Sequence, residues 1–213
     1  MDVLRIIILF STLLLTGSLS AEEHSYWQFD SNNDGITIYT REHTDGLVEI
    51  RAQMFTPTTY SAFLTLLEDS ENVPNWIDNA SHSRVLRQIS VNENIVYTQF
   101  KAPWPARDRD MVTYSKYWVD DFGFTLKISD APEPSLTEQN GYIRITAVDA
   151  SWNLQKLTNG TTLIEYKAYA DPGGLLPAWL INKLSTQSAR TTFKNLRNQL
   201  PKYQRYSHPQ MRE

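Results

Sequence analysis

Hydrophobic and polar residues alternate along several stretches of the chain with the two-residue period of half-buried β-strands. In residues 47–55, for example, Val48, Ile50, Ala52 and Met54 alternate with polar side chains. Such stretches follow one another closely, so we expect antiparallel neighbours, because parallel strands need crossovers of about a dozen residues or more. The predicted strands are residues 36–41, 47–55, 85–89, 95–101, 111–118, 122–129, 142–150 and 161–170.

Two other stretches have the spacing of amphipathic helices. Thr58 or Thr59 is expected to cap a helix that runs to about Asp69. A longer helix is predicted over residues 177–200, with its apolar side chains largely on one side. This order of elements predicts an α+β fold in which a curved antiparallel sheet is wrapped around a long C-terminal helix. Such a sheet can leave an internal apolar cavity beside the helix.

The first residues form a separate unit, a predicted secretory signal peptide. Arg5 precedes an apolar run over residues 6–15, and small residues follow it. The run is about half as long as the roughly 20 residues that a transmembrane helix needs. We therefore expect cleavage after Ser20 or Ala21, although Asp2 weakens the basic start and leaves an uncleaved anchor as the alternative.

This reading divides the chain into a signal peptide (residues 1–21), one folded domain (residues 22–206) and a polar tail (residues 207–213). A signal peptide without a cysteine for lipid attachment predicts an exported protein, and we expect a periplasmic location.

Composition excludes several classes of function. The chain has no cysteine, so disulfides and thiolate metal sites are not available to it. Its net charge of -4 argues against nucleic acid as a partner. The four histidines lack metal-ligand spacing, and no known catalytic motif is present. We therefore expect no metal, no cofactor and no enzymatic activity. Six tryptophans and eleven tyrosines supply rings that fill cores or line apolar pockets.

The middle of the chain resembles a known family. Trp76 is followed by a run at residues 85–89, by Val96-Tyr97 and then by the segment 102–110, Ala-Pro-Trp-Pro-Ala-Arg-Asp-Arg-Asp. The series is similar to the START (StAR-related lipid transfer) domains over roughly residues 25–203. The residues that carry the resemblance are Trp76, Pro103, Trp104, Pro105, Arg109 and Asp110.

The resemblance implies a helix-grip fold, a deep apolar cavity for one lipid or sterol-like molecule, and a terminal helix that acts as a lid. With its signal peptide, the chain looks like the exported bacterial branch of this family.

Four apolar strand faces and one helix face are our candidates for the lining of the cavity. The alternative for each residue is that it simply fills the core. The candidates are Ile50, Ala52, Met54, Phe124, Leu126, Ile128, Ile143, Ile145, Ala147, Ile164, Tyr166, Ala168, Leu180 and Leu184.

Two charged residues lie off these apolar faces. Arg144 and Glu165 could pair across the sheet on its outer side. A slip of one residue in register would turn both inward, where they would be natural partners for a ligand head group.

The segment 107–110 favours a turn. In it Asp108 accepts backbone N–H groups and Arg109 pairs with a neighbouring carboxylate. A clamp for phosphate or carboxylate is the alternative.

A glycine-containing connection precedes the last helix and carries Leu175, Leu176 and Trp179. Tryptophan is favoured at membrane interfaces, so this apolar cluster could be a gate that touches a bilayer transiently. The alternative is a buried staple at the start of the helix.

The leading hypothesis is a monomeric, non-catalytic protein that binds, and could transfer, a lipid or sterol-like molecule. The second is an enzyme of the wider helix-grip superfamily, a cyclase or hydrolase with Tyr166, Glu165 or Arg144 as its acid–base groups. The third is an envelope interaction module that binds a protein partner through residues 175–179.

Overall fold

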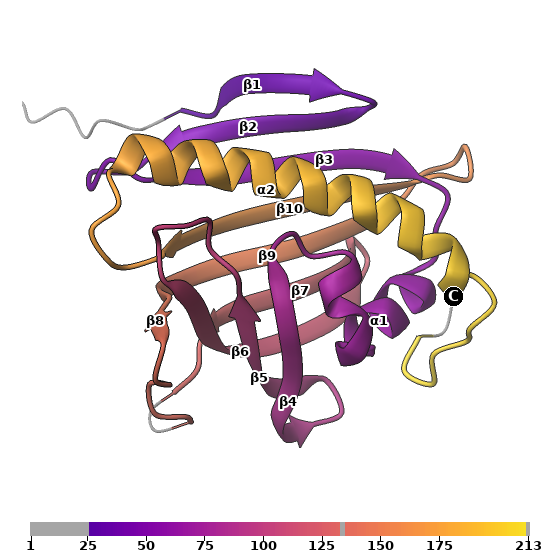
Figure 1. Ribbon diagram of the computed structural model, residues 1–213. Coiled ribbons are helices and arrows are strands. Elements are labelled where there is room, and N and C mark those ends of the chain that lie inside the picture. The colour runs from indigo at the N-terminus through magenta and orange to yellow at the C-terminus, as the bar shows by residue number, and fades with distance from the viewer. Residues whose placement is uncertain (1–25, 133–134, 212–213) are drawn as a thin grey trace, which may run out of the picture.

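One curved sheet of ten strands holds the long helix α2 (Ala178–Gln199) across one of its faces (Figure 1). This computed structural model describes residues 26–132 and 135–211, so the predicted signal peptide lies outside the described residues. The α+β class, the antiparallel sheet and the terminal helix predicted above are confirmed. Within the described ranges, no helix is long and apolar enough to cross a membrane.

The strands run in the order β1-β2-β3-β10-β9-β7-β6-β5-β4, and β8 pairs in parallel with β6. Every other pairing is antiparallel. The strands are β1 (Gln28–Asn33), β2 (Ile36–Glu42), β3 (Val48–Thr56), β4 (Ala80–Ser90), β5 (Glu93–Phe100), β6 (Asp108–Asp120), β7 (Gly123–Asp130), β8 (Tyr142–Arg144), β9 (Thr146–Lys156) and β10 (Thr162–Asp171).

The first strand was not predicted, because its residues are almost all polar and exposed and show no alternation. A tight turn joins it to β2, and both central residues, Asp34 and Gly35, have positive φ (54° and 69°). This is the backbone that two-residue hairpins require.

The predicted strand 142–150 is two strands, and this is a correction. The chain breaks at Ile145 between β8 and β9, and Ala147 has a φ of 53°. Positive φ is strained for a residue with a side chain, so the alternation of one flat strand cannot continue through it.

Three shorter helical segments complete the domain: α1 (Tyr60–Glu68), η1 (Ser70–Asn75) and η2 (Leu200–Tyr203). The predicted cap of α1 is confirmed at Thr59, whose Oγ1 accepts a hydrogen bond of 3.0 Å from the backbone N–H of Ala62. Asp69 is the residue after the helix, as predicted.

The main core lies between the sheet and the helices. The C-terminal half of α2 contributes Ala189, Phe193 and Leu196, which are buried, whereas its N-terminal half is only partly buried. The ring of Phe193 stacks on Trp152 of β9 with 5.6 Å between centroids. The helix is therefore anchored at one end and more open at the other.

A second, smaller core lies on the opposite face of the sheet. It is formed by Ile95 and Tyr97 of β5 and by Val112 of β6, and it is covered by Ala131 and Leu136. Neighbouring residues of the same strands point the other way, because side chains alternate along a strand. The sheet therefore has two distinct sides here, an outer one and one facing the helices.

Candidate ligand cavity

A cavity of about 580 Å³ lies between α1, η1 and the strands β4 to β7. This volume is within the range of pockets that hold one small ligand, roughly 300–1,000 Å³. Its lining comes from elements far apart in the sequence, including α1 and the segment after η2, which contributes His208, Pro209 and Gln210. The lining contains no residue of α2.

One wall is apolar. It is formed by Leu64 of α1, Trp76 after η1, Leu126 and Ile128 of β7, and Trp152 of β9. Trp152 also contacts Tyr166 of β10, with ring centroids 4.3 Å apart. These rings offer a large apolar surface to any molecule in the cavity.

The wall formed by β4 to β6, which continues the sheet beside β7, mixes uncharged polar and apolar side chains. The polar ones are Ser83 of β4, Asn94 and Thr98 of β5, and Thr113 and Ser115 of β6, and among them lie Val85, Val96, Met111 and Tyr117. The register places Ser83 beside Thr98 and Asn94 beside Ser115. The hydroxyls of Ser83 and Thr98 are 3.2 Å apart and share a hydrogen bond. Sequence reasoning missed this wall because it searched for apolar strand faces.

The end of the chain forms part of the rim. Nε2 of His208 lies 2.8 Å from a carboxylate oxygen of Glu68 in α1. Met211 is buried in the main core, and its backbone N–H donates to the carbonyl of His208. His208 and Met211, both assigned above to the polar tail of residues 207–213, therefore pack on the domain.

Eleven of the fourteen predicted lining residues fall into three groups. Leu126 and Ile128 line the cavity. Six others belong to or pack on the main core between the sheet and α2: Ile50, Ala52, Met54, Phe124, Ile164 and Tyr166. Ala168, Leu180 and Leu184 are half-buried.

Tyr166 has a raised pKa, about 12, because burial disfavours its charged form. The side chain is nevertheless half-buried rather than sealed.

The prediction for Ile143, Ile145 and Ala147 is corrected by the break between β8 and β9. Ala147 is exposed. Ile143 packs on the loop after β10, where its methyl group would meet a Cβ placed on Gly173 at 2.9 Å. Ile145 lies between the two strands, and its backbone N–H donates to the backbone carbonyl of Asp110 at 2.8 Å. The inner face of β9 starts instead at Val148.

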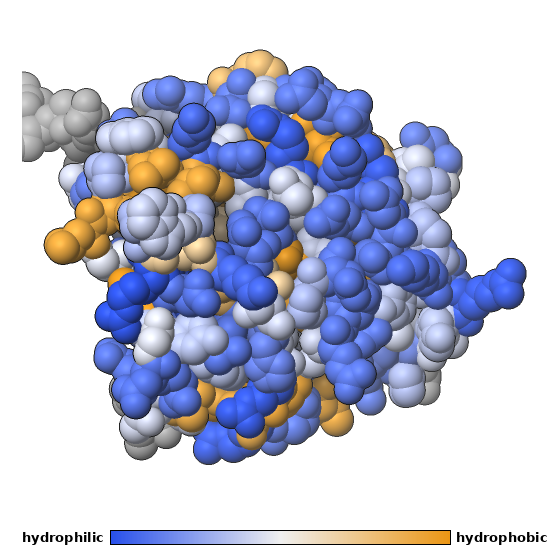
Figure 2. All heavy atoms as spheres, in the orientation of Figure 1, coloured by the Kyte–Doolittle hydropathy of each residue, from blue (hydrophilic) through white to orange (hydrophobic). Residues whose placement is uncertain are grey.

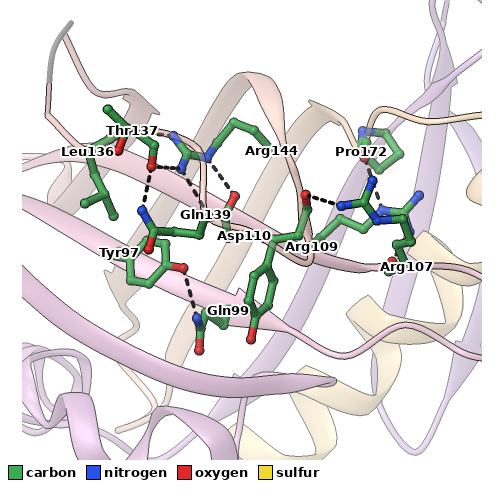
Figure 3. Close-up of polar contacts among 11 residues, drawn as sticks. Tyr97, Gln99, Arg107, Arg109, Asp110, Leu136, Thr137, Gln139, Arg144 and Pro172 are labelled. Atoms are coloured by element: carbon green, nitrogen blue, oxygen red, sulfur yellow. Dashed lines mark hydrogen bonds and ion pairs between the residues drawn. The ribbon is translucent and has the colours of Figure 1, made fainter.

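Arg144 and Glu165 neither pair with each other nor face the cavity, which corrects both alternatives given above. Arg144 binds Asp110 through two hydrogen bonds of 2.7 and 3.1 Å (Figure 3). Asp110 lies on the outer side of β6, because its neighbour Met111 lines the cavity. Glu165 pairs with Lys167 at 2.9 Å and accepts from Gln53 at 2.6 Å.

The ion pair of Asp110 with Arg144 is buried, and Arg144 makes further hydrogen bonds. Asp110 is 1% exposed, and the Arg144 guanidinium also donates to the carbonyls of Leu136 and Thr137. The hydrogen bonds that the guanidinium of Arg144 donates to Asp110 raise the pKa of Arg144. The pair thus fastens the segment before β8 to the outer side of the sheet.

Arg109 has a different role from the one predicted. Its guanidinium has no carboxylate partner among the described residues and donates instead to the carbonyls of Arg107, Pro172 and Gly173, the last two at 3.2 Å (Figure 3). Burial lowers its pKa. The predicted role of Asp108 is confirmed, since its Oδ1 accepts from the N–H of Ala102 at 2.9 Å. Arg109 therefore ties the β5–β6 loop to the β10–α2 loop.

These two loops and the first turn of α2 carry exposed apolar side chains. The exposed fractions are 93% for Trp104, 102% for Leu175 and 66% for Trp179, while Leu176 is half-buried. The buried-staple alternative is thereby excluded for Leu175 and Trp179. Figure 2 shows hydrophobic side chains gathered at this end of the molecule, where the β10–α2 loop lies in Figure 1. Pro103 and Pro105, on either side of Trp104, are also exposed.

A second hollow, of about 620 Å³, lies between α2 and the hairpin β1–β2. It is lined mainly by polar and charged side chains, among them Asn182, Lys183 and Arg190. It lacks an apolar wall, so the cavity under α1 is the better candidate for a hydrophobic ligand. In the described ranges, no group of three metal-binding side chains could hold an ion.

Comparison with known proteins places these features in context. The family model described as "START domain" matches residues 14–205. An uncharacterized protein of Pseudomonas aeruginosa, PA1579, is 25% identical over 204 residues, which cover 92% of this chain and 96% of that protein. START domain-containing protein 10 of Homo sapiens is 21% identical over 180 residues, 83% of this chain and 62% of the human protein.

A solved structure from Xanthomonas axonopodis, described as a STAR-related lipid transfer protein, superposes with a TM-score of 0.74 at 25% identity. The match covers 82% of this chain and 98% of that one.

Proposed function

Since the chain belongs to the START domain family, we propose that it binds one lipid molecule in the cavity between α1 and β4–β7, as a monomer and without catalysis. The observation that carries the proposal is the apolar wall around Leu126, Ile128 and Trp152 in a fold shared with a protein described as a lipid transfer protein. Burial of a lipid's apolar surface there would contribute roughly 25 cal/mol per Å².

The positions of the ionisable groups favour ligand binding over catalysis. Two of the three acid–base candidates, Arg144 and Glu165, lie on the outer side of the sheet, each with its own partner. The third, Tyr166, has a pKa of about 12, which keeps its hydroxyl protonated at neutral pH. A general base works best with a pKa near the working pH.

Transfer and export are further parts of the proposal. Trp104 and Leu175 on the two tied loops, together with Trp179 in the first turn of α2, are exposed and suit brief insertion into a bilayer, where tryptophan prefers the interface. The predicted signal peptide supports export of the protein with cleavage near Ser20 or Ala21. The mature protein would then act in the periplasm, between the two membranes.

Native mass spectrometry tests the binding itself. The full chain is expressed with its leader, purified from the cell envelope without detergent, and measured as it is and after incubation with lipid extract. We expect the mass of one chain with one added molecule, because the cavity has room for one ligand. A chain that carries no lipid from the cell and takes up none from the extract would contradict the proposed function.

Exchange of lipid between vesicles tests the exposed loops. With Leu175→Asp and Trp179→Ala together, we expect the rate of transfer to fall at least about tenfold, because apolar side chains that anchor at the interface are lost. Equilibrium binding of lipid in solution should stay within about twofold of wild type, since neither residue lines the cavity. Phe122, which is 86% exposed on the β6–β7 turn, provides the control Phe122→Asp. Unchanged transfer by the double variant would remove the membrane role.

A further inference from the structure

We propose that residues 207–211, here called the latch, close the mouth of the cavity and move away from α1 when a ligand enters or leaves. This inference rests on the proposed function and goes beyond it, because it names the route of the ligand and the segment that moves. It follows from three observations: where the lining of the cavity is exposed, how the rims of its mouth are held, and which elements border it.

The mouth of the cavity is identified by the exposed residues among its lining. Deep lining residues such as Leu126 and Trp152 are buried. Among the described lining residues, the exposed ones come from three places: the end of α1, strand β4 with the turn that follows it, and the latch. They are Glu68, Val85, Gln88, Val91, Pro209 and Gln210. Solvent therefore reaches the cavity between these three rims.

Two of the three rims are fixed parts of the fold. Helix α1 packs Phe63 and Leu66 into the main core, where both are fully buried. Strand β4 pairs with β5 along most of its length. The latch belongs to no helix or strand, and segments of this kind open at the lowest cost in free energy. The latch is therefore the rim that moves most easily.

A few contacts hold the latch on α1. Nε2 of His208 lies 2.8 Å from a carboxylate oxygen of Glu68, and the backbone N–H of His208 donates to Oγ of Ser61. The same Ser61 hydroxyl donates to the carbonyl of Tyr206 at 3.1 Å. The side chain of Met211 is 7% exposed and lies in the main core. Figure 1 shows the chain leave the end of α2 and return beside α1. Breaking these contacts would free the latch without unfolding a helix or a strand.

The latch is anchored at the end of η2. Tyr203 is buried there, and its hydroxyl donates to Oδ2 of Asp69 at 2.6 Å. Gln204 donates to the carbonyl of Pro57 at 3.1 Å. Residues 205 and 206 follow, and both are exposed. This short exposed connection allows the latch to move while η2 and α2 stay in place.

Helix α2 does not border the cavity. It contributes none of the described lining residues, and its Phe193 stacks on Trp152 in the main core. The resemblance stated above implies that the terminal helix is the lid. Movement of α2 would open the packed core beside Trp152, however, and not the mouth beside Glu68 and Gln88. The latch that follows the helix is thus better placed to admit a ligand.

A reversible cross-link between the latch and α1 tests the inference. The chain has no cysteine, so Glu68→Cys with His208→Cys introduces its only two thiols. A short bis-methanethiosulfonate joins them, because the native side chains meet at 2.8 Å, and a reductant releases them. The full chain is loaded from bacterial lipid extract, freed of vesicles and mixed with cyclodextrin, and native mass spectrometry follows the loss of the added mass. We expect release at least about tenfold slower from the cross-linked variant than from the same sample after reduction.

A matched cross-link holds α2 instead of the latch. Asp30→Cys with Arg190→Cys joins β1 to α2, where the native side chains lie 3.3 Å apart. Since α2 stays in place while lipid leaves, this cross-link should change the rate of release by less than about twofold. Each single-cysteine variant, treated with the same reagent, shows the effect of the modification alone and should also release lipid as wild type does.

Met211→Asp is the opposite change, because a carboxylate does not stay in the core and the latch is released. We expect it to release lipid at least about fivefold faster than wild type. Ser207→Asp adds the same charge to the latch at an exposed position and should leave the rate within about twofold of wild type. Thermal unfolding of both variants shows that they are folded.

The possible failures are distinguishable. If the latch cross-link does not slow release, if the α2 cross-link slows it as much, or if folded Met211→Asp releases lipid no faster than Ser207→Asp, the inference is overturned while the proposed function stands. If wild type carries no lipid from the cell and takes up none from the extract, both are overturned.

Discussion

Asp110→Ala is expected to lower the free energy of unfolding by about 3–5 kcal/mol, since it leaves the guanidinium of Arg144 buried without its carboxylate. Domains of this size are typically stable by about 5–15 kcal/mol, so the variant should be close to unfolding. Urea denaturation followed by tryptophan fluorescence measures the difference. The remaining bonds from Arg144, to the carbonyls of Leu136 and Thr137, satisfy donors but do not neutralise the charge.

Two further variants separate the loss of the pair from the loss of one charge. Replacing both partners, Asp110→Leu with Arg144→Met, should recover most of the stability, because apolar residues of similar volume often replace a buried pair at little cost. The exposed pair of Arg190 with Asp30 gives the comparison, and Asp30→Ala should cost no more than about 1 kcal/mol. If Asp110→Ala costs no more than Asp30→Ala, the buried pair does not hold the segment before β8.

The position of this pair shows where sequence reasoning ends. Alternation of apolar and polar residues predicted most strands correctly, because a half-buried strand must alternate. It could not assign Arg144, since β8 has only three residues and pairs in parallel with a strand about 35 positions earlier. Alternation identifies a strand but not its neighbour, and the partner of a charged side chain depends on that neighbour.

The cavity shows a second limit. Apolar faces predicted the main core well, and Ile50, Ala52 and Met54 are buried there. Alternation of apolar residues does not distinguish strands that fill a core from strands that line a cavity, because both need apolar side chains. What distinguishes the cavity is the presence of small polar residues among the apolar ones that line it, such as Thr113 and Ser115. The sequence analysis named neither residue, because it considered only apolar strand faces.

The exposed loops were anticipated more fully. For the apolar residues beside the glycine-containing connection, a membrane gate and a buried staple were both left open, and Leu175 and Trp179 are exposed. Trp104 was noted only as part of the family motif. Its place beside them depends on Arg109, whose contacts with the backbone of Pro172 and Gly173 could not be derived from spacing.

Filling the cavity should abolish binding and spare the fold. Ser115 of β6 is half-buried and lines the cavity, next to Asn94 of β5. In Ser115→Trp the indole would occupy space that the ligand needs. If it displaces about 100–200 Å² of apolar ligand surface, binding weakens by about 2.5–5 kcal/mol, which is a loss of roughly a hundredfold or more. Cavity-filling substitutions are often neutral or stabilising, so the melting temperature should not fall by more than a few degrees.

The opposite side of the same region offers a matched control. Ser129 of β7 is exposed, and its neighbour Ile128 points into the cavity. Ser129→Trp therefore adds an identical side chain outside and should leave lipid affinity within about twofold of wild type. Lipid titration and thermal unfolding are measured on both variants. Should Ser115→Trp remain folded and bind lipid as tightly as Ser129→Trp, the ligand must lie elsewhere, and the space under the open N-terminal half of α2 would be the next place to substitute.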